Sequence, residues 1–277
     1  MTQSDDAKVS CLMVTLPVPQ RLAFLQRSVR AYCRQSHENK ELVIVMDAGS
    51  QADKAAVAGY VASLGRHDIR IVDPPTKLTL GGLRNLSRAS ASGLVQCHWD
   101  DDDFHHPRRL EMQLRALRAE DRQGICLQDV MLYFSSSHVL YCTNWRATPV
   151  KGLPSTLMCR ASTAIRYPEV YEVKPSEDTA VVLQLQEFGG YGVLEDCPYL
   201  YVYVCHGGNS WPEDHHRMLA ERLGISRGLL LRREVLLREE LRQHEFGAGG
   251  ITVQGPNGPA FVLDDDPKPG IPDAARG

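Results

Sequence analysis

The sequence predicts an α/β protein with a mainly parallel sheet flanked by helices, and a helical extension towards the C-terminus. Short, almost purely apolar runs at Val9–Leu16 and Glu41–Met46 are typical of strands covered on both faces, and Ile69–Val72 is the next expected strand. Between those runs, apolar residues recur at helical spacing from Leu22 to Cys33 and from Val57 to Leu64. Strands that alternate with helices predict βαβ units, whose strands lie parallel in one sheet.

The alternation continues to Gln123 and then becomes mixed. We expect a helix near Gly82–Ser92, a strand at Leu94–Trp99 and a helix after Pro107, which suits a first helical turn. The later elements are expected in the order strand 126–134, strand 138–145, a loop rich in Gly and Pro, helix 179–187 and strand 199–204, where Tyr alternates with Leu or Val.

The chain after Trp211 differs in composition. From Glu213 to Phe246 it reads as a long helical stretch, broken at Gly224 or Gly228, with seven acidic residues and seven arginines. This balance predicts a solvated, salt-bridged helix, although its leucines leave open a homo-oligomer contact. We therefore expect a disordered N-terminus at 1–8, a main domain at 9–211 with halves 9–104 and 105–211, a helical extension at 212–246, and a Gly- and Pro-rich tail at 247–277 that holds a hairpin and then becomes disordered.

Length and charge limit the classes of function. The 277 residues, with 43% hydrophobic and 23% charged residues, are typical of a globular protein of one or two domains. A net charge of −3 gives no basic field that would favour nucleic acid as a partner. No apolar run predicts a transmembrane segment, and the first residues do not resemble a secretion signal. We expect a cytoplasmic protein, with peripheral binding at the inner membrane face left open.

The strongest chemical signal is the run His98-Trp99-Asp100-Asp101-Asp102-Asp103 at the end of an apolar strand. Adjacent carboxylates repel one another, so the run predicts a compensating cation or a set of hydrogen-bond donors. Mn²⁺ or Mg²⁺ is the simplest candidate, because these ions bind one or two carboxylates while substrate phosphates complete the shell. The alternative is a solvated acidic loop.

At this point the chain resembles the inverting glycosyltransferases of the GT-A (Rossmann-like) fold, in particular family 2. The resemblance covers about three quarters of the chain, from Val9 to Trp211. It lies in two ordered blocks, VSCLMVTLPVPQRLAFLQRSVRAYCRQSHENKELVIVMDAGS and LGGLRNLSRASASGLVQCHWDDDDFHHPRRLEMQL. They resemble the family's opening strand, helix and D-G-S loop, and its R-N helix and D-x-D-D motif.

The resemblance implies a nucleotide-sugar donor, with UDP-sugar as our first expectation. It places Asp47 on the base or ribose, although this chain has Met46-Asp47-Ala48 where the family often has two consecutive acids. It implies that Asp102 binds the metal, with Asp101 and Asp103 as alternatives. The residues implied to bind the donor are Thr15, Pro17, Asp47, Arg84, Asn85, Asp100 and Asp101. Arg84 is suited to bind the diphosphate, because a guanidinium can donate two parallel hydrogen bonds to phosphate oxygens.

Two further motifs complete the implied site. Ser176-Glu177-Asp178 resembles the family's catalytic-base motif, with Asp178 as the base and Glu177 as the alternative. A helix cap at Ser176 or Asp178 is the structural alternative. His206, in a Gly-rich turn, is implied as a further metal ligand. Lys151–Thr156 resembles the loop on the acceptor side, and the acceptor itself is a glycan, a lipid-linked glycan, a protein or a small molecule.

Two other classes of function remain open. A metal-dependent hydrolase would use the aspartates with His98, His105, His106, His215 and His216, and it predicts a two-metal cluster. A non-catalytic GT-A-like binding module would keep the fold without the chemistry. A polyprenyl synthase is excluded, because its D-D-x-x-D motifs would need an aspartate at Phe104, His105 or His106.

Overall fold

The computed structural model describes residues 6–170 and 176–264, and these fold into two compact units. The first unit runs as far as Val130 and resumes from Asn144 to Tyr203. The second comprises Met131–Thr143 and the chain from Val204 onwards. The end of the predicted tail and residues 1–5 of the predicted disordered N-terminus lie outside the described residues.

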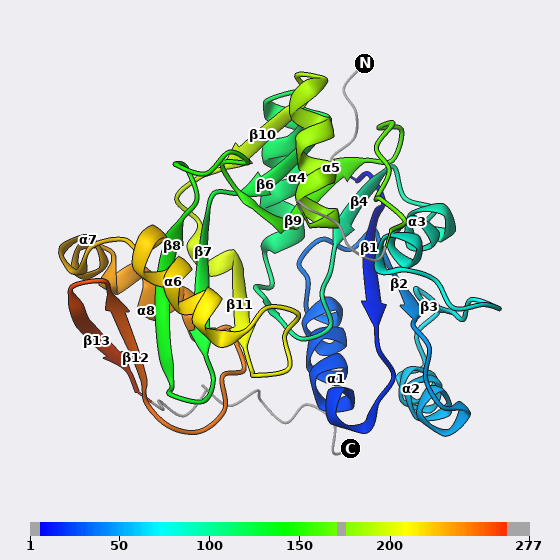
Figure 1. Cartoon of the computed structure of the whole chain (residues 1–277), viewed down its shortest axis with the longest axis horizontal. Coiled ribbons are helices and arrows are strands. Elements are labelled where there is room, and N and C mark those ends of the chain that lie inside the picture. Colours follow the sequence, from blue (N-terminus) through cyan, green and yellow to red (C-terminus); the bar gives the residue numbers. More distant parts are fainter. Residues whose placement is uncertain (1–5, 171–175, 265–277) are drawn as a thin grey trace, which may run out of the picture. The chain divides into compact units, whose positions relative to one another are not determined.

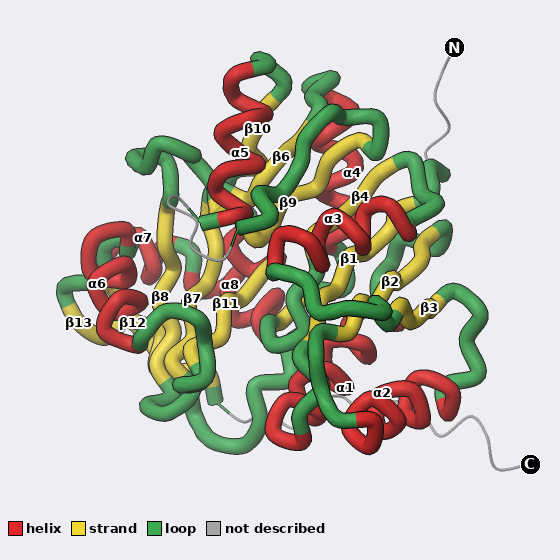
Figure 2. Tube along the Cα trace, turned by 45° about the vertical axis from the view of Figure 1, so that its right-hand side comes forward, coloured by secondary structure: helices red, strands yellow, loops and turns green. Residues whose placement is uncertain are grey.

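The first unit is built on a seven-stranded sheet with the order β10-β6-β9-β4-β1-β2-β3 (Figure 1). Neighbouring strands are parallel except at β9, which runs antiparallel to both β4 and β6. Helices flank the strands (Figure 2). The predicted mainly parallel α/β fold is therefore confirmed. Its elements are β1 Val9–Thr15, α1 Pro19–Cys33, β2 Lys40–Met46, α2 Gln51–Ser63, β3 Ile69–Val72, α3 Leu80–Ser90, β4 Val95–His98, β5 Phe104–His105, α4 Arg109–Ala119, β6 Gly124–Leu127, β9 Leu153–Arg160, α5 Glu177–Glu187, β10 Tyr191–Leu194, the short 3₁₀ helix Pro198–Leu200, and β11 Tyr201–Cys205, which crosses into the second unit.

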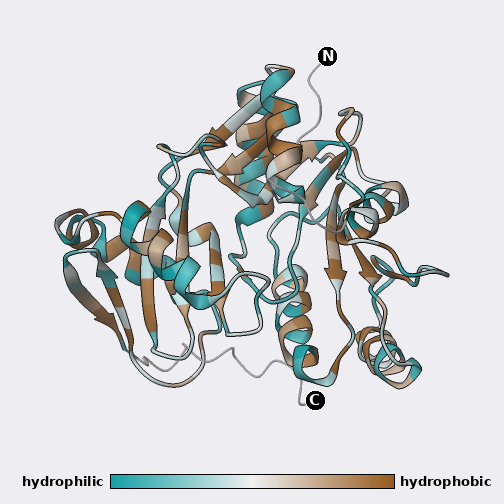
Figure 3. Ribbon diagram, viewed as in Figure 1, coloured by the Kyte–Doolittle hydropathy of each residue, from teal (hydrophilic) through white to brown (hydrophobic). Residues whose placement is uncertain are grey.

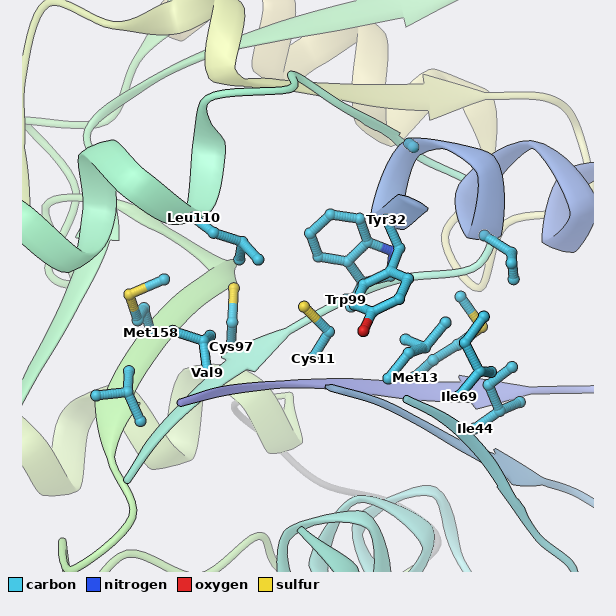
Figure 4. Close-up of a cluster of buried hydrophobic side chains, with 14 of the residues drawn as sticks. Val9, Cys11, Met13, Tyr32, Ile44, Ile69, Cys97, Trp99, Leu110 and Met158 are labelled. Carbon is cyan, nitrogen blue, oxygen red and sulfur yellow. The ribbon is translucent and has the colours of Figure 1, made fainter. Parts of the chain in front are cut away.

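The central strands are apolar on both faces because helices cover both sides of the sheet. Along β1, Cys11 and Met13 point to one face and Leu12 to the other, as the two-residue period of a strand requires. The first face carries α1, α2 and α4, and Figure 4 shows Tyr32 of α1 beside Trp99 over β1 and β4. Leu83 of α3 packs on the opposite face. Figure 3 shows the strongly hydrophobic colour of β1 and β2.

Strand β9 corrects the expected loop between residues 145 and 179. Residues 153–156 of the supposed acceptor-side loop belong to it, and only Lys151 and Gly152 lie in the preceding turn. The polar residues of this segment suggested a loop, but the hydroxyl of Thr156 forms two hydrogen bonds within the sheet. It donates to the carbonyl of Leu153 and accepts from the amide of Leu127. Pro154 lies next to the strand's first residue, where a missing amide is best tolerated.

Three other boundaries differ from the sequence prediction. The run 126–134 is two strands, β6 and β7, with a break at Gln128. The alternating run 199–204 begins as a 3₁₀ turn before β11. The stretch 213–246 is three helices, where one break was predicted, and the first helix ends at Leu223, next to Gly224, one of the two predicted breaks.

The second unit combines strands and short helices. Its strands pair in the order β13-β12-β8-β7, with β12 parallel to β8 and antiparallel to β13. Its buried side chains include Leu230, Leu237 and Phe261. Its elements are β7 Asp129–Phe134 and β8 Val139–Asn144, each of which crosses the unit boundary, α6 Glu213–Leu223, α7 Arg227–Arg232, α8 Glu234–Leu241, β12 Ile251–Gly255 and β13 Gly258–Leu263. Across residues 6–170 and 176–264, none of the helices is long and apolar enough to cross a bilayer.

Candidate active site

The four aspartates follow the carboxyl end of β4, beside the end of β1. The register pairs Leu12 with His98, and the Trp99 amide donates to the carbonyl of Leu12. In open parallel sheets this edge is where ligands bind. The chain then turns at once into β5, so the carboxylates spread towards different partners instead of forming one cluster.

Asp101 and Asp102 share a cation from the first helix. Asp101 is 2% exposed, and its carboxylate accepts from the Thr15 hydroxyl at 2.5 Å and from the guanidinium of Arg21. The same Arg21 nitrogen contacts Asp102 Oδ2 at 2.8 Å. Arg27 donates to the backbone carbonyl of Asp102 at 2.5 Å. Thr15, which we expected to bind the donor, therefore supports the aspartate run through its hydroxyl.

Asp103 and Asp100 meet at a buried tyrosine. The hydroxyl of Tyr201, on β11, contacts Asp103 Oδ2 directly and lies 3.3 Å from Asp100 Oδ2. Ser155 of β9 lies 3.2 Å from the same hydroxyl. Ser28 donates to the Asp100 carbonyl at 2.8 Å. Asp103 is thus tied into the interior, which favours Asp102 over Asp103 as the ligand that faces a substrate.

Arg84 of α3 joins the aspartate run to the second acidic motif. Its Nε donates to Glu177 Oε1 at 3.0 Å, and its Nη2 lies 3.6 Å from Asp100 Oδ1. Its Nη1 lies 2.6 Å from His98 Nε2, and that nitrogen is 2.8 Å from Asp100 Oδ1. The side chain of Arg84 is 12% exposed. Residues that are far apart in the sequence therefore meet at one guanidinium.

These contacts give neighbouring carboxyl groups opposite pKa shifts. Burial would raise the pKa of Asp100, but the ring of His98 and the guanidinium of Arg84 hold it well below its ordinary value. Burial and the charge of Asp102 raise the pKa of Asp101 to about 6, against the opposing effect of Arg21. Asp100 is therefore held ionised, whereas Asp101 takes up a proton more readily than an ordinary aspartate.

Glu177 and Asp178 form the first turn of α5. Asp178 Oδ1 accepts from the Ser176 hydroxyl at 2.5 Å and from the Thr179 amide at 2.7 Å. Ser176 occupies the N-cap position, but its hydroxyl makes no capping bond to the helix backbone. Acidic residues in a first turn are favoured by the helix dipole. The motif thus combines the start of a helix with carboxylates beside Arg84. Burial would lower the pKa of Arg84, but the charges of Asp100, Glu177 and Asp178 raise it.

The other predicted donor residues have local roles in the structure. The amide of Asn85 donates to the Tyr167 carbonyl and to Glu169, and its oxygen accepts from the Tyr167 amide, so Asn85 holds the loop after β9. Asp47 follows β2, and its carboxylate accepts from the Ala48 amide at 2.6 Å. Pro17 packs so tightly against Gly49 that a Cβ at position 49 would lie 2.6 Å from its ring.

His206 belongs to the second unit, in the loop after β11. Its Nδ1 accepts from the Gly208 amide at 3.2 Å, and Gly207 between them has a φ of +79°, which favours glycine. A neutral imidazole whose Nδ1 accepts a hydrogen bond carries its proton on Nε2. Metal binding through either ring nitrogen would therefore require the contact with Gly208 to change.

Asp102 is the carboxylate that could share a metal with the phosphates of a substrate, and its Oδ2 is paired with Arg21 in this structure. The side chain of Asp102 is 15% exposed, and one partly accessible carboxylate suits Mg²⁺ or Mn²⁺ held jointly with phosphates. Among residues 6–170 and 176–264, no group of three or more His, Cys, Asp or Glu is arranged to hold a metal ion. The two-metal cluster that a hydrolase would need is therefore not found in that part of the chain.

Two site residues, Arg21 and Tyr201, were missed by the sequence analysis. Arg21 lies on a helix in a block of ordinary amphipathic pattern, and its partners are 80 and 81 residues away. Tyr201 lies in the alternating run whose strand was predicted, and it is fully buried. Burial and the charges of Asp103 and Asp100 raise its pKa well above the ordinary value, so it is a neutral donor. A tyrosine alternating with apolar residues was the one available signal.

This chain is similar in sequence to known proteins. Residues 13–137 match the family described as Glycosyl transferase family 2. This stretch contains Arg21, Arg84 and the whole aspartate run. Over this stretch the chain resembles glycosyltransferase family 2. A relative from Bacillus subtilis (strain 168), EpsE, assigned as a glycosyltransferase, is 28% identical over 201 residues, which are 68% of this chain and 70% of EpsE. The predicted family and the enzyme class, a glycosyltransferase, are confirmed.

Solved structures agree on the fold. TarS 1–349 of S. aureus in complex with UDP-GlcNAc is 16% identical, with a TM-score of 0.56 over 84% of this chain. This chain spans 66% of that TarS chain. The mannosyltransferase PcManGT of Pyrobaculum calidifontis, in complex with GDP-Man and Mn²⁺, is 10% identical, with a TM-score of 0.55 over 86% of this chain and 68% of its own. At these identities the likeness concerns the fold alone.

Proposed function

We propose that this glycosyltransferase moves a sugar from a nucleoside diphosphate donor, a UDP-sugar, to an acceptor hydroxyl, with inversion at the anomeric carbon and with dependence on Mn²⁺ or Mg²⁺. The observation that carries the proposal is the shared contact of Arg84 with Asp100 and Glu177. It brings the acidic motif expected for the donor and the acidic motif expected for the acceptor to one guanidinium. An inverting displacement needs both groups at a single reaction centre.

On the donor side, Asp102 would hold the metal and Arg84 would contact the diphosphate. A guanidinium forks onto phosphate oxygens, and Arg84 is held at the sheet edge by its acidic neighbours. The metal would supply positive charge against the charge that develops on the leaving diphosphate. The UDP-GlcNAc bound to TarS and the GDP-Man with Mn²⁺ bound to PcManGT support a donor and a metal of this class.

On the acceptor side, Asp178 would take the proton of the attacking hydroxyl. Its Oδ1 is engaged by Ser176 and Thr179, and within the described parts of the chain no donor contacts Oδ2. A carboxylate with one anchored and one available oxygen is suited to act as a general base. Glu177 is the alternative, although its Oε1 accepts from Arg84. The acceptor is proposed as a hydroxyl of a glycan, a lipid-linked glycan, a protein or a small molecule.

The experiment is a donor screen followed by product analysis. Melting temperatures are measured with UDP-, GDP- and dTDP-sugars, each with Mn²⁺ and with EDTA, and turnover is then followed with the stabilising donor. We expect stabilisation by a UDP-sugar only when metal is present, and a product whose anomeric configuration, measured by NMR, is opposite to that of the donor. Retained configuration would overturn the inverting mechanism, and equal stabilisation in EDTA would overturn the metal requirement.

A further inference from the structure

Arg84 is held by three groups that come from different parts of the first unit. Glu177 begins α5, His98 ends β4, and Asp100 follows β4. The distances from the guanidinium are 3.0 Å to Glu177, 2.6 Å to His98 and 3.6 Å to Asp100. The side chains of Arg84, Glu177 and Asp100 are 12%, 15% and 19% exposed. The cluster is therefore mostly shielded but still reachable from solvent.

These contacts cannot all be satisfied together. His98 Nε2 faces both an Arg84 N–H and an Asp100 oxygen, and it offers either one lone pair or one proton. If Nε2 accepts from Arg84, its lone pair repels the carboxylate of Asp100. If Nε2 donates to Asp100, its proton repels the guanidinium of Arg84. His98 Nδ1 is buried and has no partner among the described residues. In either tautomer one of the two contacts of His98 Nε2 is repulsive, so an anion that drew the Arg84 guanidinium away from His98 would leave Nε2 free to donate to Asp100.

We propose, on the basis of the function proposed above, that Arg84 is exchanged between Glu177 and the diphosphate of the donor. When the guanidinium forks onto phosphate oxygens, its Nε–H turns away from Glu177. The carboxylate of Glu177 is then released at the start of α5, next to Asp178. Donor binding thereby frees a carboxylate on the acceptor side.

This exchange makes Glu177 a competitor of the donor. Replacing Glu177 by Gln removes a negative charge beside the diphosphate and removes a carboxylate that competes with the diphosphate for Arg84. Both effects act in the same direction, so Glu177→Gln should bind nucleoside diphosphate more tightly. Arg84→Lys keeps the positive charge but cannot fork, so it should bind more weakly. In the Arg84→Lys background, Glu177→Gln should lose most of its effect.

The test is a double-mutant cycle on nucleotide affinity. Calorimetry measures binding of UDP and of GDP, with Mn²⁺, to wild type, Glu177→Gln, Arg84→Lys and the double variant, and circular dichroism checks that each is folded. Glu187→Gln, at the exposed far end of α5, is the matched control. We expect about three- to fivefold tighter binding for Glu177→Gln, the size of one partly exposed charge pair, and no change for Glu187→Gln.

The outcomes separate the two proposals. Unchanged or weaker binding by folded Glu177→Gln overturns the exchange, and so does equal tightening in the Arg84→Lys background. If wild type binds neither nucleotide, the proposed function fails and the exchange fails with it. Tightening that requires Arg84 supports the exchange, because a merely structural role of Glu177 would not raise an affinity.

Discussion

Arg21 Nη2 lies 2.8 Å from Asp102 Oδ2, although 81 residues separate the two in the chain. The same nitrogen contacts Asp101, which is almost completely buried. The first helix therefore supplies the cation that allows adjacent carboxylates at the end of β4. Without such a cation, like charges at this edge would repel one another in a poorly solvated place.

We predict that Arg21→Met destabilises the fold by leaving Asp101 without its cation. The loss should be about 2–3 kcal/mol, because removal of one partner leaves a buried charge unpaired. The double variant Arg21→Met/Asp101→Asn should regain most of this stability, since the amide carries no charge. The free energy of unfolding is measured by chemical denaturation of the wild type, the two single variants and the double variant. An equal loss in Arg21→Met and in the double variant would contradict the pairing.

Metal-dependent donor binding should require Asp102. Asp102→Ala removes the proposed ligand, and we expect UDP affinity in Mn²⁺ to fall by about tenfold or more, to its value in EDTA. Asp73→Ala, a half-exposed aspartate paired with Lys54, is the control and should bind UDP normally. Calorimetry in Mn²⁺ and in EDTA measures both. If Asp102→Ala and wild type bind UDP equally in Mn²⁺, the assignment fails.

The sequence predicted those features that depend on neighbouring residues, and it missed those that depend on partners far away in the chain. Strand β2 was predicted to within one residue, as Glu41–Met46, because strands covered on both faces read as apolar runs. Strand β9 was missed because Ser155 and Thr156 are polar, and their hydroxyls find partners only once the sheet has formed. The aspartate run was predicted from its charge, but Arg21 was not, since its partners are distant in the chain and no local pattern marks them.

The second acidic motif shows the same limit. Glu177 and Asp178 were predicted from a three-residue block, and the structure brings Glu177 onto Arg84. The sequence could not predict that His98 would meet both Arg84 and Asp100, because this depends on the register of β4 against β1 and on the position of α3. Side chains that act together were predicted singly, and their mutual contacts required the fold.

His206 should influence the metal titration if it is a ligand. We predict that His206→Ala raises the Mn²⁺ concentration needed for half-maximal activity, while the melting temperature stays within about 2 °C. His206→Gln, which retains a hydrogen-bond acceptor for the Gly208 amide, separates loop support from metal binding. Turnover is measured across a series of Mn²⁺ concentrations. An unchanged titration would leave His206 with a structural role only.

Stability should depend on pH through Glu41. Burial would raise its pKa, but hydrogen bonds from Ser10, Ser92 and Lys8 lower it to about 2. Because the folded pKa lies below the ordinary value, this stabilisation is present above about pH 4.5 and is lost as the pH falls towards 2. Glu41→Gln should therefore destabilise by roughly 2 kcal/mol at pH 7 and by much less near pH 3.

The control for Glu41 is Glu38→Gln, an exposed glutamate in the preceding turn. Urea unfolding of the three proteins at pH 7, 5, 4 and 3 gives the comparison. A difference between Glu41→Gln and wild type that stays constant from pH 7 to pH 3 would show that the charge of Glu41 does not carry the effect.

The decisive variant for catalysis is Asp178→Asn. The amide keeps the size of the side chain and an oxygen that can accept from Ser176 and Thr179, so a purely structural role predicts a loss of about 1 kcal/mol or less. A general base responds differently, because an amide takes up no proton and loss of such a group slows reactions by roughly 10²–10⁴-fold. We expect this drop in turnover with UDP-sugar affinity and melting temperature nearly unchanged. Glu177→Gln, assayed in parallel, distinguishes the two carboxylates: if it loses the same 10²–10⁴-fold while Asp178→Asn turns over almost normally, Glu177 is the base and Asp178 only supports the first turn of α5.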